Sequence, residues 1–166
     1  MCHVVRDGAT LPPMVARWLA SLTAVLAGLL AGGMLLIRVV LVPFWRSVPP
    51  SEFRRWFGAY SGHIRRLMLP LGPASAVAAT ASAITQTATA DGDRVSSVTA
   101  AATAVGVVAI TVSVNEPTNA RFVEDGLSDD ETAALLRRWA RWHDVRVALG
   151  LIGALAAARA ASAQRR

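Results

Sequence analysis

Two polar segments interrupt an otherwise apolar chain, and they carry the side chains best suited to chemistry. Charged and amide groups beside membrane-spanning segments are costly unless they are paired, so we interpret them as functional candidates. The two segments contribute Asn115, Glu116, Asn119, Trp139, Trp142, His143 and Arg146. A further imidazole, His63, lies in a separate polar segment earlier in the chain.

One chemistry that these residues could support is metal-assisted oxidation. His63, Glu116 and His143 form a two-histidine, one-carboxylate set, which suits a metal with open positions for dioxygen. One or two iron or copper ions are the candidates, although the three ligands come from separate segments and no spacing motif joins them.

The same residues also suit chemistry without a metal. His143 could take a proton from an acidic phenol or an activated methylene, with His63 and Glu116 as its partners. Arg146 and the amides of Asn115 and Asn119 would then stabilise the resulting oxyanion. The sequence leaves both versions open.

Substrate contacts are expected from flat and charged side chains near the same segments. Trp139 and Trp142 could form walls for an aromatic molecule, and Arg38, a charge inside the first apolar segment, is a third candidate. Trp45 and Trp56, near the end of that segment, fit an interfacial aromatic belt better.

Helical spacing predicts which of these residues share a face. Trp139, His143 and Arg146 follow an i, i+4, i+7 pattern, which places them on one stripe of a helix. Asp144 falls off that stripe and should find a backbone or arginine partner elsewhere.

Composition places the chain among integral membrane proteins. Of its 166 residues, 54% are hydrophobic and 17% are charged, below the roughly one quarter that is usual for soluble domains. The net charge of +6 comes from arginines that flank apolar segments, so nucleic acid is not an expected partner. Cys2 is the single cysteine, which excludes an internal disulfide.

A spanning helix needs about 20 mostly apolar residues, and four segments meet that requirement. We expect spans at about 15–44, 67–90, 95–114 and 145–161, which make one domain over residues 1–166. The predicted fold is an all-α integral membrane up-down four-helix bundle.

Local signals predict where these helices begin and end. Pro43 and the pair Pro49-Pro50 should close the first span, Pro70 and Pro73 should make the second one irregular at its start, and Pro117 should break the third at Glu116. A tight turn is expected at Asp91-Gly92-Asp93.

Two further local signals concern the fourth and first helices. Ser128 and Glu131 form a predicted capping box, so the fourth helix should start near residue 129, well before its apolar part. In the first span, Gly28 and Gly32 offer a small-xxx-small contact to a neighbouring helix.

Four spans place the two long connections, Trp45–Arg66 and Asn115–Arg146, on the same membrane face. His63 and His143 should therefore lie within about 15 Å of each other if they share one pocket. Arginine is more frequent in these connections than at the termini and the short turn, which favours a cytoplasmic location for them in a bacterial inner membrane.

The two polar segments resemble those of a known family. Asn115, Pro117 and Asn119 match an Asn/Pro/Asn element after the third span, and Trp139, His143 and Arg146 match a Trp-x-x-x-His-x-x-Arg element that opens the fourth helix. On these residues the chain resembles the anthrone oxygenase-like family of small four-helix membrane proteins. Glu116 departs from the family pattern as an added carboxylate.

The resemblance implies an oxidoreductase of secondary metabolism, a monooxygenase that uses dioxygen to tailor a small lipophilic substrate in the bilayer. The alternative is a non-catalytic membrane subunit that anchors or feeds a soluble partner oxygenase, and homo-oligomers are a further option. A transporter is disfavoured, because four short spans leave little room for a conduit.

Overall fold

The computed structural model describes residues 12–88 and 93–164. The predicted turn at Asp91 and Gly92 lies outside the described residues, as does Cys2.

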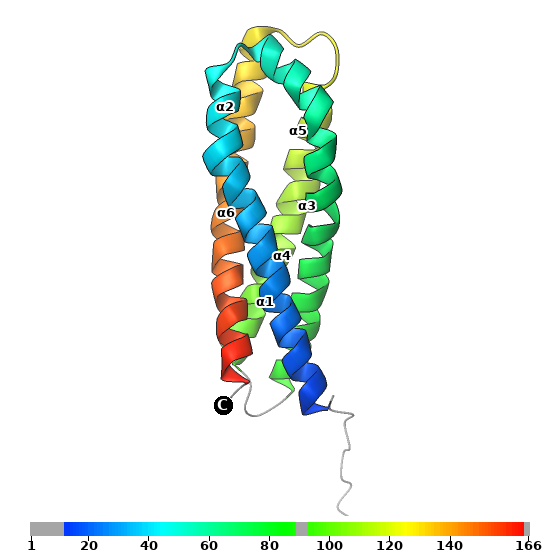
Figure 1. Ribbon diagram of the computed structural model, residues 1–166, viewed down its shortest axis with the longest axis vertical. Helices are drawn as coiled ribbons and strands as arrows, with labels where there is room; N and C mark the ends of the chain where they lie inside the picture. Colours follow the sequence, from blue (N-terminus) through cyan, green and yellow to red (C-terminus); the bar gives the residue numbers. More distant parts are fainter. Residues whose placement is uncertain (1–11, 89–92, 165–166) are drawn as a thin grey trace, which may run out of the picture.

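Every described element is helical, and the longer helices run almost the full length of the molecule (Figure 1). The α-helices are α1 (Pro13–Leu36), α2 (Val42–Ser47), α3 (Pro50–Thr87), α4 (Arg94–Ile110), α5 (Glu116–Phe122) and α6 (Asp129–Ala163). Five-residue π-turns join α1 to α2 (Ile37–Leu41) and α4 to α5 (Thr111–Asn115).

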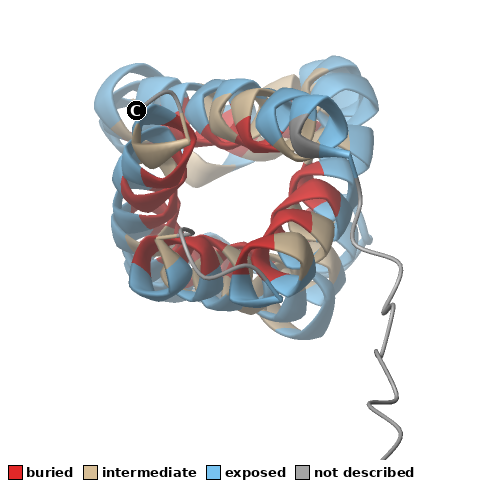
Figure 2. Cartoon of the chain, turned by 90° about the horizontal axis from the view of Figure 1, so that it is seen from below, coloured by how far each residue is buried: buried red, intermediate tan, exposed pale blue. Residues whose placement is uncertain are grey.

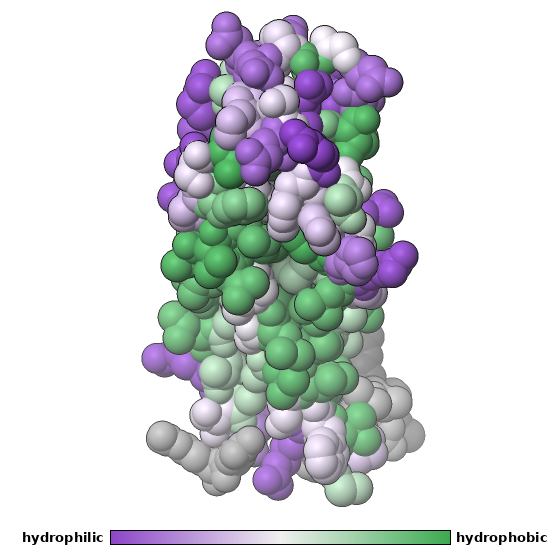
Figure 3. All heavy atoms as spheres, turned by 45° about the horizontal axis from the view of Figure 1, so that its top comes forward, coloured by the Kyte–Doolittle hydropathy of each residue, from purple (hydrophilic) through white to green (hydrophobic). Residues whose placement is uncertain are grey.

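Four helical stretches of the described chain are long and apolar enough to cross a membrane. They are Met14–Ser47, Pro50–Thr87, Arg94–Phe122 and Asp129–Ala163. An apolar band crosses the middle of the molecular surface, with hydrophilic side chains gathered towards its two ends (Figure 3). The predicted fold, an all-helical membrane bundle of four long helices, is therefore confirmed.

The four long helices form a square bundle. Helix α1 packs on α3 and α6, and α4 packs on the same two helices from the opposite corner. Seen along the bundle, the buried residues line the inside of the square and the exposed ones point outwards (Figure 2). In this arrangement each helix turns one face to the interior and another to lipid.

The first helix does not end at Pro43, but it does end before the predicted pair Pro49-Pro50. The chain remains helical to Ser47, and the extended backbone of Val48 then leads into Pro49 and α3. A proline ring clashes with the carbonyl four residues earlier in a regular α-helix. Here the π-turn Ile37–Leu41 widens the backbone just before Pro43, so the helix accommodates the ring and continues.

The break predicted at Glu116 is wrong for the same physical reason. The π-turn Thr111–Asn115 precedes Pro117, and the backbone N–H of Glu116 bonds to the carbonyl of Thr111. The helix therefore continues through α5 to Phe122. Each π-turn ends two residues before a proline.

The irregular start predicted for the second span is not observed. Helix α3 is continuous from Pro50 to Thr87, with Pro70 and Pro73 inside it. Most of each segment predicted as a long connection is therefore helix, and residues 48–49 and 123–128 form the actual breaks at that end. Functional side chains there stand on rigid helices.

Helix α6 begins at Asp129 with the predicted capping box. The Ser128 hydroxyl accepts from the backbone N–H of Glu131, and the Glu131 carboxylate accepts from the backbone N–H of Ser128. These two bonds satisfy backbone donors that the first turn of a helix leaves unpaired.

The interior changes in character along the bundle axis. Near the chain termini the helices meet through alanines such as Ala27, Ala100 and Ala157, whose small size allows close backbone approach. Near α2 and α5 the core is aromatic, and it includes Trp45, which the sequence had assigned to an interfacial belt but which is only 3% exposed. The polar residues of the candidate site lie at the aromatic end.

The close contact with a neighbouring helix that was expected at Gly28 and Gly32 of α1 is made by other glycines. No described atom outside the helix's own backbone lies within 4 Å of a Cβ built on Gly28 or Gly32, so these two do not touch a neighbouring helix. Gly33 and Gly150 make the close approaches instead.

Candidate functional site

His143 lies at the centre of the polar residues and is fully buried. Its Nε2 is 3.0 Å from the carbonyl oxygen of Met34, at the end of α1. Its Nδ1 is 2.6 Å from Nη2 of Arg146. An arginine only donates and a carbonyl only accepts, so both contacts fit a neutral imidazole with its proton on Nε2. His143 thereby connects α1 with α6 and uses both ring nitrogens.

Arg146 is a buried cation held without an ion pair. Its side chain donates to His143 and, through Nη1 at 3.0 Å, to the hydroxyl of Thr111 in the second π-turn. Its guanidinium carbon also lies 5.9 Å from the ring centre of Trp139. No ion pair of Arg146 is found in the described part of the chain, and its Nε has no hydrogen-bond partner there. A buried cation that makes no direct ion pair with a described carboxylate favours binding of an anionic or strongly accepting group.

The stripe predicted from helical spacing is present. The rings of Trp139 and His143 stack with centroids 4.8 Å apart at 16°. Arg146 follows them one turn later, in contact with both. The three side chains form one rigid unit on the inner face of α6.

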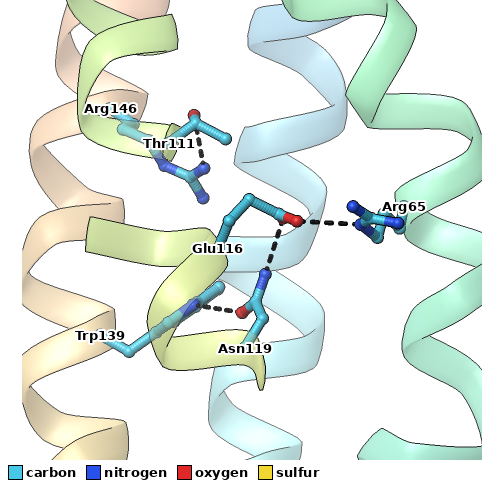
Figure 4. A network of polar contacts seen from close by, with 6 residues as sticks. All are labelled: Arg65, Thr111, Glu116, Asn119, Trp139 and Arg146. Carbon is cyan, nitrogen blue, oxygen red and sulfur yellow. Dashed lines mark hydrogen bonds and ion pairs between the residues drawn. The ribbon is translucent and has the colours of Figure 1, made fainter. Parts of the chain in front are cut away.

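A hydrogen-bonded chain runs from Trp139 across the bundle to α3 (Figure 4). The indole N–H of Trp139 donates to Oδ1 of Asn119 at 2.9 Å, and Nδ2 of Asn119 donates to Oε1 of Glu116 at 3.1 Å. Nε of Arg65 then donates to Oε2 of Glu116 at 2.9 Å. Both carboxylate oxygens of Glu116 are therefore held in fixed positions by neighbours.

These residues surround a cavity of about 110 Å³ inside the bundle. Its polar lining consists of Ser61, Arg65, Thr111, Glu116, Asn119 and Arg146. Its apolar lining includes Met34, Trp45, Phe57, Met68 and Trp139. A mostly apolar chamber with a few fixed polar groups is typical of a small-molecule site.

Trp45 carries a buried indole donor beside this chamber. Its ring packs edge-on against Trp139, with centroids 5.5 Å apart at 70°. The indole N–H has no hydrogen-bond partner among the described residues, although it is buried. Trp45 lines the cavity, while this N–H itself has almost no accessible surface.

Five predicted site residues do not line the cavity: His63, His143, Arg38, Trp142 and Asn115. Arg38 forms an ion pair with Asp144, which confirms the arginine partner expected for Asp144. Trp142 is 38% exposed on the outer side of α6. Asn115 is buried in the second π-turn, where neither of its amide atoms has a hydrogen-bond partner among the described residues.

His63 is exposed on α3 and does not line the cavity. No group of three His, Cys, Asp or Glu side chains within the described residues is placed to hold a metal ion. The candidate metal ligands His63, Glu116 and His143 are therefore not brought together. The physical reason is that His143 uses both nitrogens within the core, while Glu116 is bound by Arg65 and Asn119.

The sequence reasoning missed several lining residues. By its position beside a span, Trp45 fits an interfacial belt residue. Arg65 fits one of the arginines that favour a cytoplasmic location of their connection. Thr111 lies in an apolar run and gave no signal of its own. Its position in a π-turn before Pro117 could have drawn attention to it, since such turns are frequent at functional sites.

The chain matches the model of a known protein family. The protein-family model described as anthrone oxygenase matches residues 53–156, which is more than half of the chain and includes α5, most of α3 and the site-bearing part of α6. No curated protein and no solved structure matches the chain significantly.

Proposed function

The chain belongs to the anthrone oxygenase family, which implies an oxidoreductase, and on that basis we propose a membrane oxygenase for a small lipophilic aromatic substrate. The substrate class is a phenol or anthrone with an activated methylene, oxidised by dioxygen in the cavity between the helices. The observation that carries this proposal is the buried Arg146, which makes no ion pair among the described residues, at a cavity with aromatic walls.

Arg146 stabilises the oxyanion that forms when such a substrate loses a proton. A donor fixed in a water-poor site contributes strongly to transition-state stabilisation, because it needs no reorganisation during the reaction. The Thr111 hydroxyl and Nδ1 of His143 hold two of its nitrogens, and Nε remains without a partner in the described structure.

Glu116 is the base in this proposal, and His143 is a positioning residue. Both nitrogens of His143 are engaged and its ring lies outside the cavity lining, whereas the carboxylate of Glu116 lines the cavity. Asn119 and Arg65 fix the two oxygens of Glu116, which orients the remaining lone pairs. The base role that the sequence suggested for His143 thus passes to Glu116.

The chemistry balances with dioxygen as the oxidant. Glu116 removes a proton from the methylene carbon, and the negative charge moves to the substrate oxygen beside Arg146. The carbanion is oxidised as a carbon–oxygen bond forms to dioxygen, and the returned proton gives a hydroperoxide. Loss of water from the hydroperoxide leaves a carbonyl, so one methylene and one dioxygen give one ketone and one water.

The substrate would enter from the bilayer between α3 and the second π-turn. Of the cavity-lining residues, the exposed ones lie there: Arg65, Leu69 and Pro73 on α3, and Val112 in the π-turn. The lining residues from α1 and α6, such as Met34 and Trp139, are buried. Both anthrones and dioxygen partition into lipid, which makes a lateral entrance suitable.

The test uses purified protein in lipid nanodiscs with anthrone as the probe. Oxygen uptake and anthraquinone formation should rise together above empty nanodiscs, in a one-to-one ratio. Arg146→Ala should lower the rate by about 100-fold or more, whereas Arg141→Ala, an exposed arginine on the same helix, should leave it unchanged.

The result also separates the two function classes. If membranes that carry this protein alone consume no oxygen with anthrone, and activity appears only when a soluble oxygenase is added, the chain is an accessory subunit and the catalytic proposal is wrong. Elemental analysis of the same samples tests whether iron or copper accompanies the activity.

A further inference from the structure

We infer that Gly33 and Gly150 are specificity-determining positions, because they hold two methionines back from the cavity and so set the size of the substrate that fits. This inference rests on the proposed function, since it concerns the same cavity. Met34 and Met68 are two of the four methionines in the chain, and both line the cavity.

The first pair joins α1 to α3. A Cβ built on Gly33 would lie 2.8 Å from the sulfur of Met68 and 3.1 Å from its terminal methyl carbon. Non-bonded carbon atoms prefer about 3.5–4.0 Å, so the thioether would have to move by about 1 Å. The end of a methionine side chain is flexible, so it would move before the helix backbone does.

The second pair joins α6 to α1. A Cβ on Gly150 would collide with the terminal methyl of Met34, and it would also lie 3.5 Å from Cα of Ala31. Because the backbone of α1 stands behind Met34, the methionine side chain must yield. Met34 is 1% exposed, so the cavity is the free space towards which its methyl can turn.

The direction of both movements follows from what surrounds the methionines. Met68 packs between the aromatic cluster and the cluster that contains Leu30, Met34 and Val107. Pressure from Gly33 pushes it away from α1, towards the chamber that it lines. An added methyl group at either glycine therefore makes the chamber smaller without touching Arg146, Glu116 or Asn119.

The chain offers matched control positions. Gly32 is the sequence neighbour of Gly33, and no described atom outside its own helix backbone lies within 4 Å of a Cβ built there. Gly153 lies one turn beyond Gly150, and a Cβ there would lie 2.5 Å from the hydroxyl oxygen of Thr103, which is not a cavity residue. Gly32→Ala thus tests the added methyl alone, and Gly153→Ala tests general packing damage.

The experiment measures binding and not turnover, so its outcome is independent of the reaction. Two non-reacting probes are titrated into protein in nanodiscs: 1-hydroxyanthraquinone with three fused rings and 1-naphthol with two. Gly33→Ala and Gly150→Ala should weaken binding of the three-ring probe by about tenfold or more, the range for one excess methylene in an apolar pocket. Binding of 1-naphthol should change much less, and both controls should bind like the parent protein.

Methionine methyl NMR gives a direct view of the moving groups. With ¹³C-methyl methionine, the three-ring probe should shift the resonances of Met34 and Met68 but not that of Met14, which is 68% exposed. Gly33→Ala alone should shift the Met68 methyl. If Gly150→Ala does not fold, the double variant Gly33→Ala/Met68→Ala supplies the second test, since it should restore binding of the three-ring probe.

The inference is overturned if Gly33→Ala leaves the Met68 resonance in place, or if it weakens both probes equally. Failure of the proposed function looks different. In that case anthrone is not oxidised, yet the probes still shift Met34 and Met68 and still discriminate between the glycine variants.

Discussion

Arg146 and His143 form the closest polar contact between buried side chains of the site, with Nη2 of the arginine 2.6 Å from Nδ1 of the histidine. Because the other imidazole nitrogen reaches the carbonyl of Met34 in α1, the histidine fixes a buried cation on α6 against a neighbouring helix. In the proposed mechanism this contact orients Arg146.

Replacing His143 should lower the free energy of unfolding. The conservative variant His143→Gln should lose less of its kcat than of this stability. His143→Ala leaves an Arg146 N–H unpaired and removes the side-chain partner of the Met34 carbonyl, which keeps its bond from the backbone N–H of Ile37. A buried donor left unpaired costs about 1–3 kcal/mol. His143→Gln retains a donor and an acceptor, so it should recover part of the unfolding free energy and part of kcat. Denaturation in detergent and anthrone oxidation measure the two effects. A loss of kcat in His143→Gln as large as that in Glu116→Gln would instead indicate that the histidine is the base.

The ion pair between Arg65 and Glu116 should matter for activity and little for stability. The Arg65 side chain is 60% exposed, and exposed pairs contribute about 0–1 kcal/mol. Glu116→Gln should lower kcat by about 100-fold or more, as expected for loss of a general base, and Arg65→Ala should lower it less. A double-mutant cycle on both unfolding and kcat checks this, with Glu124→Gln as a control because Glu124 pairs with Arg121 outside the cavity. An unaltered kcat in Glu116→Gln would contradict the assignment of the base.

A bulky residue at the lateral entrance should hinder substrate entry. Val112→Trp should lower kcat/KM for anthrone by about tenfold with kcat nearly unchanged, since entry is affected and chemistry is not. Val105→Trp is the matched control, because Val105 is similarly exposed on α4 and does not line the cavity. Steady-state kinetics in nanodiscs measure both. Equal effects of the two variants would exclude this route.

Acid should weaken the N-terminus of α4 through Asp93. The backbone N–H of Ser96 donates to its carboxylate, and this bond lowers the pKa of Asp93 below its ordinary value of 3.8. A depressed pKa contributes stability that is fully present above the ordinary value and is lost as the pH falls through the lower, folded-state pKa. Asp93→Asn keeps a capping side chain without the charge, so its thermal stability should vary less with pH in this acid range. Parallel melting curves of the two proteins test the difference.

The sequence alone predicts the four-helix bundle and part of the candidate site. Apolar length predicts four spanning helices, and helical spacing predicts the contact of Trp139, His143 and Arg146, because both depend on local periodicity. The start of α6 is equally local, since Ser128 and Glu131 satisfy each other's backbone donors. The cytoplasmic placement of the polar end stays a prediction.

The errors arise where distant residues decide the outcome. Proline rules predicted helix ends at Pro43 and Pro117, but a preceding π-turn accommodates each ring. Whether a histidine is a ligand or a core residue also depends on partners from other helices: His143 meets Met34 and Arg146, whereas His63 points out of the bundle's core. No pattern within α3 or α6 alone carries that information.

The two π-turns have a consequence for the register of the helices that follow them. Each residue advances an α-helix by about 100°, so one extra residue would rotate everything downstream by that amount unless the backbone widened to absorb it. The π-turn Thr111–Asn115 absorbs its surplus residue in this way and also accommodates the ring of Pro117. Deleting Val112 or Ser113 should therefore remove the π-turn and bring the proline ring against a carbonyl of the regular helix, so α5 should kink or break. The surplus residue, far from any reacting atom, lets a helix with a proline in its path carry Glu116 and Asn119 on to the chamber.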